Sequence, residues 1–331
     1  MSDSTQSGAI RTVGTALKRK QLRRSRALSG DRIFSSLILF LALLVLSVSG
    51  LIVYVLVQRG QLAFSTFGPF GLLFSSDWNP PRGQYGALPF LVGTLITSLG
   101  ALLLSVPLAV AAALYVTEYA PSWLAEPVSY LIELLAAIPS VVYGFWGVAV
   151  MVPFIRQLQL VVIQTPGLNR VPFLRGAPIG YGLLAAICIL AIMIVPYTTA
   201  VARDVIRLVP RDQREAAYAL GATKWEVLRY AVLPFARAGI FGGVILSLGR
   251  ALGETIAVTM VIGNATRLPD TLFSTAATMP SIIASQFPEA NDPLMRSSLI
   301  AIGLYLFLAT LLINLAARWV IHRLSPKGMS V

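Results

Sequence analysis

The stretch "VPRDQREAAYALGATKWEVLRYAVLPFARAGI" (209–240) is a polar, basic segment between two long apolar runs. Its alanines favour a first short helix, and Gly221 can adopt the left-handed conformation that ends one. Thr223, followed three residues later by Glu226, forms the sequence pattern of a capping box, which predicts a second helix that ends near Pro234. The segment is therefore predicted to be a helix-turn-helix whose two ends are joined to membrane-spanning helices.

The chain as a whole has the composition of an integral membrane protein. Of its 331 residues, 56% are hydrophobic and only 12% are charged. Several apolar runs reach about 20 residues, the length at which a helix crosses a bilayer. We expect an all-α polytopic fold with six spans, in which Pro139 and Pro196 kink the third and fourth. The spans are predicted at 33–57, 88–115, 128–154, 179–202, 238–262 and 297–317.

Three parts are expected along the chain: a basic cytoplasmic tail (1–32), a transmembrane domain (33–320) with a cytoplasmic loop at about 204–236, and a cytoplasmic tail (321–331). The first apolar run is too long for the core of a signal peptide, which indicates an uncleaved signal anchor. Lys and Arg are concentrated in the tails and in the 204–236 loop. The positive-inside rule then places both termini in the cytoplasm.

Several classes of function are excluded by what the sequence lacks. One cysteine (Cys188) and one histidine (His322) cannot form an internal disulfide framework, a Cys/His zinc site or a nucleophile-histidine active site with further partners. The net charge of +12 follows the membrane topology and not a nucleic-acid-binding surface. A groove-reading helix-turn-helix is disfavoured because membrane helices hold both its ends. No Gly-Lys dipeptide occurs, so any ATPase must be a separate polypeptide.

The polar loop resembles a known motif. Glu215-Ala216-Ala217, then Gly221, and Leu233-Pro234 at the close are similar to the EAA motif of ABC importer permeases. Ala231 departs from the isoleucine that the family has near that close. The resemblance implies that the loop is a coupling helix, which docks on a cytoplasmic ATPase.

Three further stretches resemble the permease subunits of phosphate ABC importers, of the PstC type: "ELLAAIPSVVYGFWG" (133–147), "ILAIMIVPYTTAVARDV" (189–205) and "LGRALGETIAVTMVIGN" (248–264). The likeness extends from about residue 85 to the end. It implies a type I ABC importer permease in a bacterial inner membrane, not itself an enzyme. It also implies four partners besides the lipid bilayer: a sister permease (PstA type), an ATPase dimer with ATP and Mg²⁺ (PstB type), an extracytoplasmic binding protein (PstS type) and phosphate. No cofactor is expected in this chain.

Two charges stand inside the predicted fifth span. A charge at the centre of a bilayer costs about 3 kcal/mol on insertion scales, so Arg250 and Glu254 call for a functional reason. Positions four apart on a helix share one face, so the two side chains are predicted to lie next to each other. Gly249 and Gly253 form a small-xxx-small pair, which predicts close packing of another helix beside the charges. Glu133 is a third candidate charge within the membrane, after Arg250 and Glu254.

Arg250 and Glu254 could neutralise each other as a structural ion pair, but buried pairs stabilise a fold poorly compared with apolar residues. Arginine presents donors that match a tetrahedral oxyanion, so a role in a substrate pathway is favoured, with Glu254 holding the guanidinium between anions. The resemblance also implicates this region in phosphate passage. The sequence therefore predicts half of a phosphate translocation pathway. A sulfate or molybdate permease and an ion-coupled secondary transporter stay open as alternatives, whereas a membrane hydrolase lacks its motifs.

Overall fold

The computed structural model describes residues 4–165, 167 and 171–324. This described part is helical and contains no strand beyond two isolated bridges. Six of its helical segments are long and apolar enough to cross a membrane, which confirms the predicted all-α fold and the number of spans. The segments are Asp31–Phe67, Leu88–Tyr119, Ser140–Gln164, Leu183–Arg207, Lys224–Gly253 and Pro293–Trp319. The side chain of His322 and residues 325–331 of the predicted C-terminal tail lie outside the described part.

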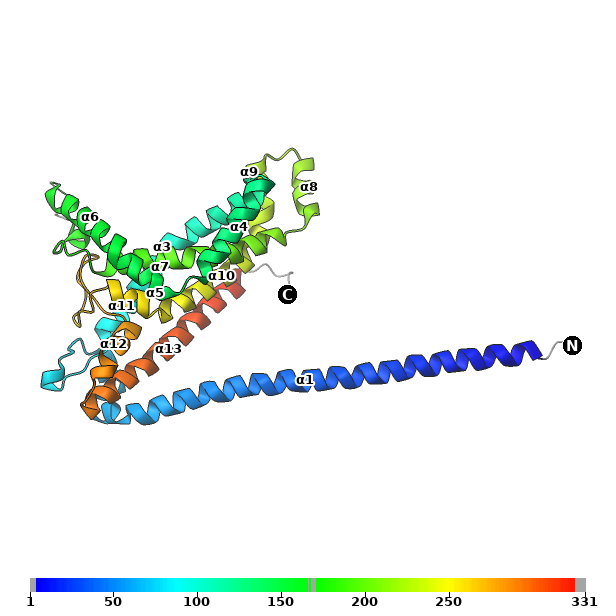
Figure 1. The fold of residues 1–331 in the computed structure, drawn as a ribbon, viewed down its shortest axis with the longest axis horizontal. Helices are drawn as coiled ribbons and strands as arrows, with labels where there is room; N and C mark the ends of the chain where they lie inside the picture. The colour runs from blue at the N-terminus through cyan, green and yellow to red at the C-terminus, as the bar shows by residue number, and fades with distance from the viewer. Residues whose placement is uncertain (1–3, 166, 168–170, 325–331) are drawn as a thin grey trace. The chain divides into compact units, whose positions relative to one another are not determined.

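Figure 1 labels the helices along the chain, which divides into two units, Met1–Gln58 and Arg59–Val331. Helix α1 covers the first unit and the start of the second. The helices are α1 (Ser4–Phe67), α2 (Pro69–Phe74), α3 (Leu88–Leu114) with the π-helical turn η2 (Tyr115–Tyr119), α4 (Ser122–Ala137), α5 (Ser140–Trp146), the π-helical turn η3 (Gly147–Met151), α6 (Val152–Gln164), α7 (Leu183–Arg207), α8 (Arg211–Ala219), α9 (Lys224–Val227), the π-helical turn η6 (Leu228–Val232), α10 (Leu233–Gly253), α11 (Ile256–Val261), α12 (Met279–Gln286) and α13 (Pro293–Leu324).

The core of the second unit is built around α7. This helix packs against α3, α10 and α4, and more than half of its most apolar segment is buried. Close approach to α10 depends on Gly239 and Gly243, because a Cβ at either position would collide with Val205 or Val201 of α7. Small residues four apart let two helix backbones approach in this way. The long apolar run of α7 thus becomes the buried centre of this unit.

A second cluster of buried residues lies at the loop between α2 and α3. The rings of Tyr85 and Phe90 pack edge-on against Trp78, with centroids 5.0 and 5.2 Å away. The Tyr85 hydroxyl donates a hydrogen bond to Asp292 Oδ2 over 3.1 Å. Burial and this neighbouring carboxylate raise the pKa of Tyr85 to about 12. The loop is therefore an ordered cap over the helix ends.

The third span differs from the prediction of one helix over 128–154. Helix α4 ends at Ala137, and Ile138 and Pro139 are extended, with ψ values of 130° and 139°. Proline disfavours helical torsions in the residue before it, which explains the break. The spanning segment begins after it, at Ser140. Pro196 behaves differently, since α7 continues through it.

The fifth span also begins and ends differently from the predicted 238–262. It starts at Lys224, passes through η6, and ends at Gly253. Pro234 lies in the first turn of α10, so the prediction that the second cytoplasmic helix ends there is wrong. A proline in a first turn has no intrahelical N–H bond to lose, and the wider π turn before it absorbs the change of register.

Candidate functional site

Arg250 and Glu254 do not share a helix face. Helix α10 ends at Gly253, and Glu254 has extended torsions (φ −67°, ψ 124°). Its Oε1 accepts a hydrogen bond from the backbone N–H of Ala257 over 3.2 Å, at the start of α11. No ion pair joins Arg250 to Glu254 in the described part of the chain. The predicted pairing is therefore wrong, because the spacing rule holds only on an unbroken helix.

Arg250 lies exposed in the last turn of α10. Among the described residues, no carboxylate is within ion-pair distance of its guanidinium. It lies near Tyr143 of α5, whose hydroxyl donates a hydrogen bond to the carbonyl of Leu135 in α4 over 2.9 Å. Arg250 is thus a guanidinium in a membrane-spanning helix, close to the break between α4 and α5, with its donors open to a further molecule.

The surroundings of Arg250 include two interrupted helices that meet. Helix α5 packs on α11, and Gly144 makes this contact close, since a Cβ there would lie 2.5 Å from the sulfur of Met260. The break before α5 and the break before α11 are therefore joined by packing. Interrupted helices within a membrane occur where the free backbone groups face protein or a polar path.

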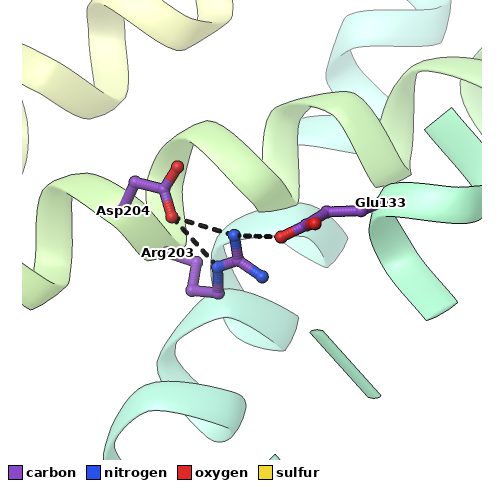
Figure 2. Close-up of polar contacts among 3 residues, drawn as sticks. All are labelled: Glu133, Arg203 and Asp204. Carbon is purple, nitrogen blue, oxygen red and sulfur yellow. Dashed lines mark hydrogen bonds and ion pairs between the residues drawn. The ribbon is translucent and has the colours of Figure 1, made fainter. Parts of the chain in front are cut away.

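Glu133, the third charged residue predicted within the membrane, pairs with an arginine other than Arg250. Figure 2 shows the guanidinium of Arg203 between the carboxylates of Glu133 and Asp204. Arg203 Nη2 lies 2.7 Å from Glu133 Oε1 and 2.9 Å from Asp204 Oδ1. The Arg203 side chain is only 6% exposed, whereas the two carboxylates are 55% and 63% exposed. This cluster, which we call the Arg203 cluster, ties α4 to α7.

Arg203 was not predicted as a site residue, because the predicted fourth span ended one residue before it. The helix continues to Arg207, and Arg203 follows Thr199 and precedes Ile206 on its buried face. These spacings of four and three residues are the signal that could have identified it. A buried cation is tolerated mainly when it is paired, so the buried Arg203 guanidinium requires a nearby carboxylate.

The loop between the fourth and fifth spans folds as predicted into two helices. Gly221, with φ of 81°, follows the C-cap of α8, where only glycine takes the left-handed region at little cost. Thr223 and Glu226 form the predicted capping box at the start of α9. Figure 1 shows α8 and α9 side by side at one end of the second unit.

The residues of the EAA-like motif fall into two environments. Glu215 and Ala216 are exposed on α8, whereas Ala217 is half-buried against the core. In the first turn of α10, Leu233 packs on the same core and Pro234 is exposed. The loop also exposes large apolar side chains: Leu220 is 90% exposed and Trp225 is 58% exposed. Such side chains favour burial by another protein.

The Gly249 and Gly253 pair contacts no other helix closely within the described residues. A Cβ at Gly249 would lie 3.9 Å from Asn314 Nδ2, and one at Gly253 would have no atom within 4 Å. The close packing of α10 inside this chain uses Gly239 and Gly243 instead. Packing of a second chain at Gly249 and Gly253 stays a prediction.

Comparisons with known proteins agree with this architecture. The family model described as "Binding-protein-dependent transport system inner membrane component" matches residues 105–326. The phosphate transport system permease protein PstC of Mesorhizobium japonicum is 45% identical over 302 residues, which cover 90% of this chain and 91% of that protein. The PstC protein of Pasteurella multocida is 48% identical over 268 residues, which cover 80% of this chain and 83% of that protein.

A solved structure has a similar fold. A chain from a bacterial alginate ABC transporter, in complex with an alginate pentasaccharide-bound periplasmic protein, aligns with a TM-score of 0.60. The alignment covers 88% of this chain and 96% of that one, at 22% identity, so it bears on the fold alone. The matched family model and the two PstC relatives lead to one conclusion: the chain belongs to the family of binding-protein-dependent transport system inner membrane components.

Proposed function

We propose that this chain is a permease subunit of an ATP-driven importer of inorganic phosphate. The observation that carries the proposal is its 45% identity, over nearly its whole length, to a phosphate transport system permease. The exposed guanidinium of Arg250 supports the same substrate class, since it can offer paired donors to a tetrahedral oxyanion.

The proposed translocation pathway lies between this chain and a sister permease of the PstA type. Arg250 would offset part of the dehydration cost of phosphate as it passes from one side to the other. Weak binding is required there, because an ion that is held tightly is not released. Glu254 would act by fixing the start of α11, through its hydrogen bond to Ala257, and not by holding Arg250. Glu133 would act indirectly, through its ion pair with Arg203.

The α8–α9 segment is the proposed docking site for a cytoplasmic ATPase dimer of the PstB type, which would bind ATP and Mg²⁺. Its exposed Leu220 and Trp225 support this assignment, because both side chains gain from burial at an interface. An extracytoplasmic protein of the PstS type would deliver phosphate at the opposite side. The membrane is then a bacterial inner membrane, with both termini in the cytoplasm.

Phosphate uptake by the complete complex tests this function. Vesicles that contain this permease, its sister subunit and the ATPase should take up radiolabelled phosphate only with internal ATP and external binding protein. A protonophore should leave the rate unchanged, and excess unlabelled phosphate should compete where sulfate and molybdate do not. Uptake driven by a proton gradient without ATP, or displaced by sulfate, would contradict the proposal.

Orientation is tested by labelling single cysteines in a variant that lacks Cys188. A cysteine at Ser76, an exposed residue in the loop before α3, should react with an impermeant thiol reagent applied outside the inner membrane. A cysteine at Ser25, in the basic tail, should react only after the membrane is opened. The reverse pattern would overturn the proposed topology.

A further inference from the structure

Helix α8 is held to the rest of the unit by few side chains. None of its nine residues is buried. Only Arg214 and Ala217 are half-buried, and the other residues of α8 are exposed. Apolar packing, the usual means of fixing one helix on another, is thus nearly absent here. Besides the packing of Ala217 on the core, the position of α8 therefore depends on polar contacts.

Arg214 supplies those contacts. Its Nη2 lies 2.9 Å from Glu118 Oε1 in η2, the last turn that continues α3. The same Nη2 donates a hydrogen bond to the carbonyl of Ile206, in the last turn of α7, over 2.9 Å. The side chains of Arg214 and Glu118 are 24% and 13% exposed, so water screens their attraction less than it would on an open surface. One guanidinium therefore joins α8 to two membrane-spanning helices.

A second contact reaches the same turn from the other side of the loop. Lys224, the first residue of α9, places its Nζ 4.5 Å from the centroid of the Tyr119 ring. Tyr119 follows Glu118 directly in η2. Helices α8 and α9 are thus both tied, through Arg214 and Lys224, to the η2 end of α3.

We propose that Arg214 is a positioning residue that passes the displacement of α8 to α3 and α7. This inference rests on the proposed function, in which the ATPase moves α8. An ion pair and a backbone hydrogen bond from one planar group resist both sliding and rotation of α8. They add to the packing of Val209 and Ala222, which hold the linkers before and after α8 on the core. Because α3 and α7 pack on each other, a displacement delivered through Arg214 reaches the core of the unit.

The test compares Arg214→Gln with Arg207→Gln in the complete complex in vesicles. Arg207 is an exposed arginine at the end of α7 and serves as the matched control. Arg214→Gln should still co-purify with the ATPase and hydrolyse ATP, but phosphate transported per ATP should fall by roughly tenfold, within the range of typical coupling effects. Arg207→Gln should keep the wild-type ratio.

Charge reversal makes the test specific to the ion pair. Arg214→Glu and Glu118→Arg should each uncouple transport, and the double variant should recover much of the lost ratio. A wild-type ratio in Arg214→Gln, or a double variant no better than the single ones, would overturn the inference. Loss of the ATPase from Arg214→Gln would also overturn it, since the contact would then serve docking. Wild-type vesicles that hydrolyse ATP without phosphate uptake would instead refute the proposed function.

Discussion

Arg250→Ala is expected to reduce phosphate uptake by roughly 10-fold to 100-fold, the effect of losing one charge-assisted interaction of about 1.5–3 kcal/mol. The complex should still assemble, because no carboxylate among the described residues pairs with Arg250 and its removal leaves no charge behind. Uptake of radiolabelled phosphate, normalised to assembled complex and compared with its rate of ATP hydrolysis, is the measurement.

Two matched variants sharpen this result. Arg156→Ala removes another exposed arginine, from the Ser140–Gln164 span, and should leave uptake near the wild-type rate. Arg250→Lys keeps the charge but loses the planar fork of donors, so an intermediate rate is expected. Wild-type uptake in Arg250→Ala would show that Arg250 has no role in the pathway. An equal loss of uptake in Arg156→Ala would show that removing any exposed arginine from a span has this effect.

In the Arg203 cluster, removing both acids should cost more stability than removing the arginine. The double variant Glu133→Gln with Asp204→Asn leaves a guanidinium that is only 6% exposed without a carboxylate. Loss of a partner from a fully buried pair costs about 3–5 kcal/mol, and the half-exposed acids reduce this to about 1–3 kcal/mol here. Arg203→Met should cost less, since the two carboxylates it leaves can be hydrated and methionine fills much of the volume.

Thermal unfolding of the purified complex measures this order. Arg207→Met, in an exposed position one turn further along α7, is the control and should unfold like the wild type. If Arg203→Met unfolded at a lower temperature than the double acid variant, the unpaired buried cation would not be the larger cost. The packing of the arginine side chain against its neighbours would then explain its presence.

Sequence patterns predicted the elements whose causes are local. Six apolar runs are long enough to cross a bilayer, and each became a spanning segment, although the third and fifth were displaced. The capping box of Thr223 and Glu226 depends on residues three apart, so its geometry follows from sequence alone. Gly221 likewise takes the left-handed torsions that the turn requires.

The candidate site was less predictable, because its geometry depends on helix breaks and on long-range packing. Gly253 was interpreted as a packing residue and not as the end of a helix, so the spacing of Arg250 and Glu254 was misread as one helix face. The partner of Glu133 lies 70 positions away, on α7. Only the packing of α4 on α7 brings Glu133 to Arg203.

The two interruptions, at Ile138–Pro139 and at Glu254–Thr255, have a mechanical consequence. Each begins with one long backbone hydrogen bond, of 3.3 Å from Ile138 to Leu135 and 3.4 Å from Glu254 to Ala251. Torsions at these residues can therefore change without breaking a helical ladder. Since α5 and α11 pack on each other just beyond the two interruptions, and both also contact α7, a change of torsion at one interruption acts on the other helix as well.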